Sequence, residues 1–100
     1  MKKPPECENM DDIRLEIDAI DSEIVALIGK RAGYVHAAAK FKKDPASVKA
    51  PERVKRMLAQ RRRLAEEQHL DPDFIENLFS TIVEYFIAGE MKTWSKCKHS

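Results

Sequence analysis

Isoleucine and leucine recur at a helical spacing through the first third of the chain. They follow one another at intervals of 4, 3, 4 and 3 residues: Ile13, Ile17, Ile20, Ile24 and Leu27. This spacing places the side chains on one face of an α-helix. No proline interrupts residues 11–44, so the pattern predicts a first helix of about thirty residues. Asn9 or Asp11 can cap its start, after a loose lead-in over residues 1–10.

The length of this first helix has a consequence for assembly. Thirty residues of α-helix extend about 45 Å. Two shorter helices of the same chain cannot cover an apolar face of that length. We therefore expect a second copy of the chain to cover it.

Two further helices follow. Asp44 and Pro45 are predicted to end the first helix, and residues 43–50 are predicted to form a polar loop. Pro51 suits the first position of a second helix, which ends near His69. One side of that helix is apolar: Val54, Met57, Leu58, Leu64 and Ala65.

Asp71 and Pro72 form a cap and a first-turn proline that open a third helix. It carries one broad apolar stripe: Ile75, Leu78, Phe79, Ile82, Val83, Phe86, Ile87, Met91 and Trp94. No alternating strand pattern appears. The sequence predicts a single all-α domain over residues 1–100, with one long helix and two shorter ones.

The amino-acid composition limits the classes of function that the chain can have. Apolar residues make up 43% of the chain, as in ordinary globular proteins. The 18 basic and 17 acidic residues give a net charge of +1, which argues against a nucleic-acid or membrane-surface binder. No apolar run reaches the roughly 18 residues of a membrane span, and the start lacks the apolar segment of a secretion signal. We expect a cytoplasmic protein.

The two cysteines, Cys7 and Cys97, lie near opposite ends of the chain. Neither Cys-x-x-Cys nor a zinc-type Cys/His spacing is present, so no metal site is predicted. A disulfide between them stays open, but free thiols suit a reducing compartment better.

Basic residues occupy the apolar seam beyond Leu27. The same count reaches Arg31, Val35, Ala38 and Lys42. Eleven residues separate the two cations, which is within about 20° of three full helical turns, with a rise of about 16 Å. Two cations on one face either extend to solvent or converge on a small anion. Because burying unpaired cations is costly, the second interpretation predicts an anion site.

Three other charged residues are candidates. Arg14 lies 17 residues before Arg31, or about 25 Å along the helix, so it is either a surface residue or part of a second protomer's site. Arg53, in the first turn of the second helix, either forms a surface ion pair or closes over a ligand. Glu90 falls within the apolar stripe after Phe86 and Ile87, where a carboxylate needs a cation or a proton.

Three segments resemble the all-helical chorismate mutase family: DIRLEIDAIDSEIVALIGKRAGYVHAAAKFK, APERV and FIENLFSTIVEYFIAGEMKTW. Together they extend the resemblance over essentially residues 4–95. The motif ending in FK, followed by APERV, resembles the isochorismate-pyruvate lyase branch of that family. The resemblance implies an intertwined homodimer with two equivalent active sites.

The resemblance also implies roles for individual residues. Arg14 would come from the partner protomer to bind a substrate carboxylate, and Arg31 would bind near the other carboxylate and the ether oxygen. Lys42 would stabilise the charge that develops as the C–O bond breaks. The remaining site residues would be Arg53, Val35, Ala38, Phe86, Ile87 and Glu90.

Position 90 departs from the family pattern, in which glutamine is common. Glutamine can donate a hydrogen bond to the ether oxygen, whereas an ionised Glu90 cannot. The hypothesis is that Glu90 is protonated in the productive complex, so that activity falls as the pH rises.

The implied reaction converts isochorismate to salicylate and pyruvate, in salicylate or siderophore biosynthesis, without a cofactor or metal. Residues 43–50 are the candidate for a mobile lid. Two alternatives stay open: chorismate mutase as the main activity, and a non-catalytic helical dimer that binds a dicarboxylate.

Overall fold

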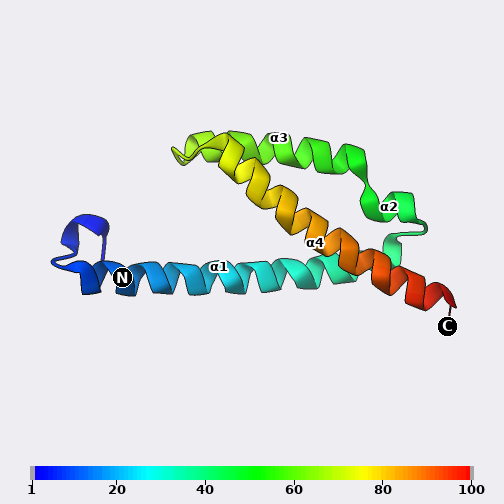
Figure 1. Cartoon of the computed structure of the whole chain (residues 1–100), viewed down its shortest axis with the longest axis horizontal. Coiled ribbons are helices and arrows are strands. Elements are labelled where there is room, and N and C mark those ends of the chain that lie inside the picture. Colours follow the sequence, from blue (N-terminus) through cyan, green and yellow to red (C-terminus); the bar gives the residue numbers. More distant parts are fainter. Residues whose placement is uncertain (1, 100) are drawn as a thin grey trace. The chain divides into compact units, whose positions relative to one another are not determined.

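The computed structural model describes the backbone of residues 2–99 and the side chains of residues 2–92. Its long helices are α1 (Met10–Ala38), α3 (Pro51–Glu67) and α4 (Pro72–His99), and α2 (Pro45–Lys49) is short (Figure 1). Two 3₁₀ turns, η1 (Pro4–Glu6) and η2 (Ala39–Phe41), complete the secondary structure, and the described residues contain no strand. The predicted all-α class with three main helices is confirmed. The side chains of Trp94 and Cys97 lie outside the described residues.

The predicted helix lengths are partly wrong. α4 has 28 residues and is almost as long as α1, which has 29. No proline follows Pro72, and Gly89 inside the helix costs only about 1 kcal/mol relative to alanine. The chain therefore has two long helices and one shorter one.

The end of α1 also differs from the prediction. α1 stops at Ala38 rather than near residue 44, and the Lys42 N–H donates to the Ala39 carbonyl at 3.1 Å in a tighter turn. Asp44 precedes a proline, which disfavours helical backbone, and it is extended at φ −155° and ψ 168°. Lys42 is extended as well, at φ −98° and ψ 123°. The prediction that Lys42 shares a helical face with Arg31 is therefore wrong.

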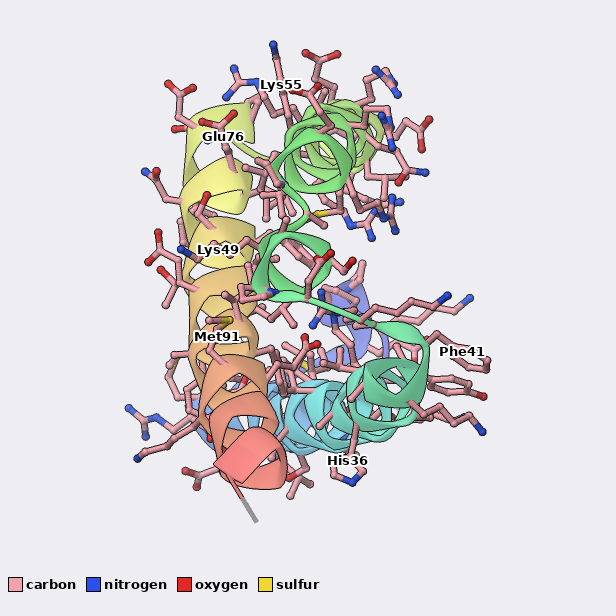
Figure 2. The ribbon with its side chains drawn as sticks, turned by 90° about the vertical axis from the view of Figure 1, so that its right-hand side faces the viewer. His36, Phe41, Lys49, Lys55, Glu76 and Met91 are labelled. Carbon is pink, nitrogen blue, oxygen red and sulfur yellow. The ribbon has the colours of Figure 1, made fainter. Side chains whose placement is uncertain are left out.

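Part of the predicted loop over residues 43–50 is helical. The Oδ1 atom of Asp44 accepts the Ser47 N–H at 2.8 Å, which caps α2, and Pro45 takes the first helical position. Val48 of α2 is 4% exposed. α2 lies beside α4 (Figure 2), so this segment is packed rather than free.

The chain divides into two compact units, Met1–Tyr34 and Val35–Ser100. In the second unit, α3 and α4 pack along each other and are joined by a turn in which His69 has φ 60° (Figure 1). Its most buried side chains come from all three of its main helical segments: Val48, Met57, Ala65 and Val83. Asp71 accepts the Asp73 N–H at 2.9 Å, and the predicted start of α4 is confirmed.

In the first unit, the residues before α1 are attached to its first turn. Asn9 accepts the Asp12 N–H at 2.9 Å and so is the cap. The carboxylate of Asp12 accepts the Glu8 N–H and the Lys2 ammonium, each at 3.0 Å. These two hydrogen bonds lower the pKa of Asp12, and the bond from the Glu8 N–H has the larger effect. The lead-in was predicted to be loose, but Lys2 and Glu8 are hydrogen-bonded to the first turn of α1.

The apolar seam of α1 is exposed. No residue of this helix is buried. The seam side chains are between 38% and 61% exposed: Ile13, Ile17, Ile20, Ile24 and Leu27. Exposed apolar side chains at this spacing are typical of a helix face that packs on another element. Among the described residues, no helix combines the length and the apolar character needed to cross a membrane.

Candidate active site

The second unit contains an ion pair between residues 48 positions apart. The Lys42 ammonium donates to Oε2 of Glu90 at 2.6 Å. Lys42 lies on the extended segment after η2, and Glu90 lies on α4. Their side chains are 24% and 9% exposed, so both charges are largely removed from water. A short charge-assisted hydrogen bond in such surroundings is stronger than one at the surface.

The position of Glu90 explains why it needs this partner. Phe86 and Ile87, one helical turn earlier on α4, are half-buried and apolar. An ionised carboxylate among apolar side chains is stable only when a cation or hydrogen-bond donors accompany it. Lys42 supplies the positive charge. Of the two partners that the sequence left open, the structure has the cation.

The apolar candidates Val35 and Ala38 are half-buried in the last turns of α1 that belong to the second unit. On α4, the Phe86 ring contacts Tyr85 edge-to-face, with 5.2 Å between ring centroids. Tyr85 itself is exposed. His36 and Phe41, near the end of α1, point outward (Figure 2). The half-buried apolar candidates therefore come from α1, which precedes Lys42 in the chain, and from α4, which carries its partner Glu90.

The three arginine candidates differ in their surroundings. Arg53 is exposed in the first turn of α3. In the first unit, Arg14 is 68% exposed, and its guanidinium lies 3.9 Å from the Asp11 carboxylate, one turn away. Arg31, also in the first unit, is half-buried. The structure thus brings Lys42 and Glu90 together and leaves Arg14 and Arg53 at the surface.

Sequence reasoning missed the Lys42–Glu90 contact and the role of Asp44 as a helix cap. The first joins distant segments, so local spacing carries no signal for it. The second had a signal, because Asp44-Pro45 repeats the Asp-Pro pair of Asp71-Pro72 that correctly predicted the start of α4. Within the described part of the chain, no group of three or more His, Cys, Asp or Glu side chains could hold a metal ion.

Comparison with known proteins identifies the family. Residues 13–91 match the chorismate mutase type II family. The chain belongs to this family. The resemblance noted from its helical segments is confirmed.

The relatives differ in how much of their length this chain covers. The chain is 46% identical over 98 residues to isochorismate pyruvate lyase of Pseudomonas aeruginosa, covering 98% of this chain and 97% of that protein. It is 34% identical over 84 residues (83% of this chain) to the T-protein of Haemophilus influenzae, of which it covers 22%. It is 33% identical over 89 residues (87% of this chain) to the bifunctional chorismate mutase/prephenate dehydratase of Buchnera aphidicola, of which it covers 23%. The chain thus spans almost all of the first relative and under a quarter of the other two.

The ion pair predicts an asymmetric effect of mutation on stability. Lys42→Met keeps the side-chain length but leaves the Glu90 carboxylate unpaired, which should lower the free energy of unfolding by about 1–3 kcal/mol. Adding Glu90→Gln should recover part of that loss, because the neutral amide is cheaper to bury. Urea denaturation at one fixed protein concentration measures both. A double variant less stable than Lys42→Met would contradict the pairing.

Proposed function

We propose that the chain is an isochorismate-pyruvate lyase of salicylate or siderophore biosynthesis, converting isochorismate to salicylate and pyruvate. The observation that carries the proposal is the 46% identity to the Pseudomonas lyase over 97% of that protein's length. The family match and the half-buried Lys42 ammonium beside α4 support the same conclusion.

The reaction needs little chemistry from the protein. The ether C–O bond breaks while a ring hydrogen moves to the enolpyruvyl methylene carbon. The hydrogen transfer is intramolecular, so no side chain has to give or take a proton. The enzyme has to hold a compact substrate conformer and stabilise the negative charge that develops on the departing oxygen. Lys42 performs the second task, because a positive charge in a largely dry site acts more strongly than one in water.

The substrate's two carboxylates call for additional cations. Arg31 and Arg53 bind them from the same chain, and Arg14 binds from a partner protomer. The apolar part of the ring lies against a wall of half-buried side chains: Val35, Ala38, Phe86 and Ile87.

The assembly is a homodimer. The exposed seam of α1 supports this proposal, because a second copy of the same helix offers a matching apolar face. An antiparallel pairing of two such helices brings Arg14 of one protomer to the site of the other.

Glu90 and the substrate compete for Lys42. An ionised Glu90 neutralises the ammonium that the departing oxygen needs. A protonated Glu90 releases Lys42 and donates its own hydrogen bond to the ether oxygen. The productive complex therefore carries a proton on Glu90.

Chorismate mutase activity is the second candidate function. The family match and the mutase named in the Buchnera relative support it. The same cations can hold chorismate folded for rearrangement to prephenate, and we expect this as a weaker side activity.

The direct test is incubation of the purified chain with isochorismate in the presence of EDTA, while salicylate fluorescence is followed. We expect salicylate and pyruvate to form in equal amounts, and turnover of chorismate to be slower. A chain that binds a dicarboxylate analogue but converts neither compound would be a binding module instead.

Lys42→Ala should lower kcat by about 10²–10³-fold with a smaller change in KM, because its charge acts mainly on the transition state. Steady-state kinetics with isochorismate measures the split. Lys43→Ala, which removes an adjacent exposed charge, is the matched control and should behave like the wild type. A Lys42→Ala effect confined to KM would contradict this role.

Glu90→Gln should change the pH profile. The hypothesis predicts that wild-type kcat/KM falls as the pH rises, because only a neutral Glu90 donates to the ether oxygen and leaves the charge of Lys42 available. Glutamine donates a hydrogen bond at every pH, so the alkaline limb should flatten in the variant. An alkaline limb that is the same in both proteins would rule out a proton on Glu90.

A further inference from the structure

The segment that carries Lys42 is attached to α4 at two points. The Lys42 ammonium contacts Glu90 of α4 at 2.6 Å. Six residues later, Val48 of α2 is 4% exposed, and α2 packs on the same helix (Figure 2). Lys42 and α2, only a few residues apart, therefore both contact the same helix.

α2 is too short to be stable alone. It has five residues, well under the length of about 12–15 at which isolated helices become marginal. Its order must come from its ends and from the burial of Val48. At the carboxyl end, the Ala50 N–H donates to the Ala46 carbonyl at 2.8 Å, and Ala50 adopts the left-handed conformation at φ 39°.

Asp44 secures the other end. Its side chain accepts the Ser47 N–H at 2.8 Å, and its carbonyl accepts the Val48 N–H at 3.3 Å. Pro45 has no N–H, so it leaves no donor unsatisfied at the first helical position. The hydrogen bonds from Ser47 lower the pKa of Asp44, so the cap is an ionised carboxylate at neutral pH.

One residue separates this cap from Lys42. On its amino side, the Lys42 N–H is bonded to the Ala39 carbonyl at 3.1 Å. On its carboxyl side, Asp44 fixes an extended backbone that leads into α2. Lys42 is therefore flanked by a backbone hydrogen bond on its amino side and, on its carboxyl side, by the cap in which the Asp44 side chain accepts the Ser47 N–H.

We propose that Asp44 is a positioning residue, which keeps α2 folded on α4 and thereby holds the Lys42 ammonium in place before substrate arrives. The inference rests on the proposed function for its kinetic consequence. A charge fixed in advance stabilises a transition state without reorganisation during the reaction. A Lys42 on a frayed segment has to be ordered in each turnover, which lowers kcat.

Two substitutions separate the cap from the charge. Asp44→Ala removes both, whereas Asp44→Asn removes the charge but keeps an equally good cap. Asp44→Ala should lower kcat for isochorismate about five- to tenfold, with KM changed by less than about twofold. Asp44→Asn should restore kcat to within about twofold of the wild type. Lys49→Ala, at an exposed position of α2, is the matched control and should behave like the wild type.

Amide hydrogen exchange gives the structural readout. Exchange over residues 46–50 should be faster in Asp44→Ala than in the wild type, and exchange in Asp44→Asn and Lys49→Ala should stay close to that of the wild type. Unchanged kcat and exchange in Asp44→Ala would overturn the proposal. An Asp44→Asn variant as impaired as Asp44→Ala would also overturn it, because the charge rather than the cap would then matter.

A third readout does not depend on turnover. The NMR signal of the Lys42 ε-methylene should respond to Glu90→Gln in the wild-type background and lose that response in the Asp44→Ala background. A response of equal size in both backgrounds would show that Asp44 does not position Lys42. If isochorismate is not converted by the wild type, the proposed function fails, while exchange and NMR still decide the role of Asp44.

Discussion

A carboxylate on an apolar helix face has to meet a cation or hold a proton, and Glu90 of α4 is in this position. Lys42 is the cation that it meets, at 2.6 Å. Because Lys42 lies between η2 and α2, the ion pair attaches the whole connection between α1 and α3 to α4. The same pair gives the proposed site its electrostatics. An ammonium held in largely dry surroundings can act on a developing negative charge more strongly than one in water.

The two compact units bury their apolar side chains to different degrees. In the second unit, α2, α3 and α4 bury Val48, Met57, Ala65 and Val83 against one another. In the first unit, α1 buries no residue, and its seam of isoleucine and leucine stays exposed. A helix with this pattern gains its stability from a face packed on another element. The proposed dimer supplies that element.

Local patterns predicted most of the fold. The spacing of isoleucines predicted α1, and the caps and prolines at Asn9, Pro51 and Asp71 predicted three helix starts, because these signals act within a few residues. The end of α1 was predicted wrongly, because extending the spacing of 4 and 3 residues beyond Leu27 assumes that the helix continues. The connection to α2 ends it, and Lys42 leaves the register. The Lys42–Glu90 contact joins residues 48 positions apart, and such contacts depend on how helices pack rather than on local spacing.

In the proposed dimer, Lys42 of one chain and Arg14 of another act on the same substrate, and subunit mixing tests this arrangement most directly. Arg14→Ala and Lys42→Ala variants, each expected to be nearly inactive because it lacks one cation of the site, are unfolded together and refolded in equal amounts. Half of the dimers are then mixed, and one of the two sites in each mixed dimer has both residues intact, so about a quarter of the wild-type activity should return. Activity no higher than the mean of the two separate variants would contradict a site that two chains share.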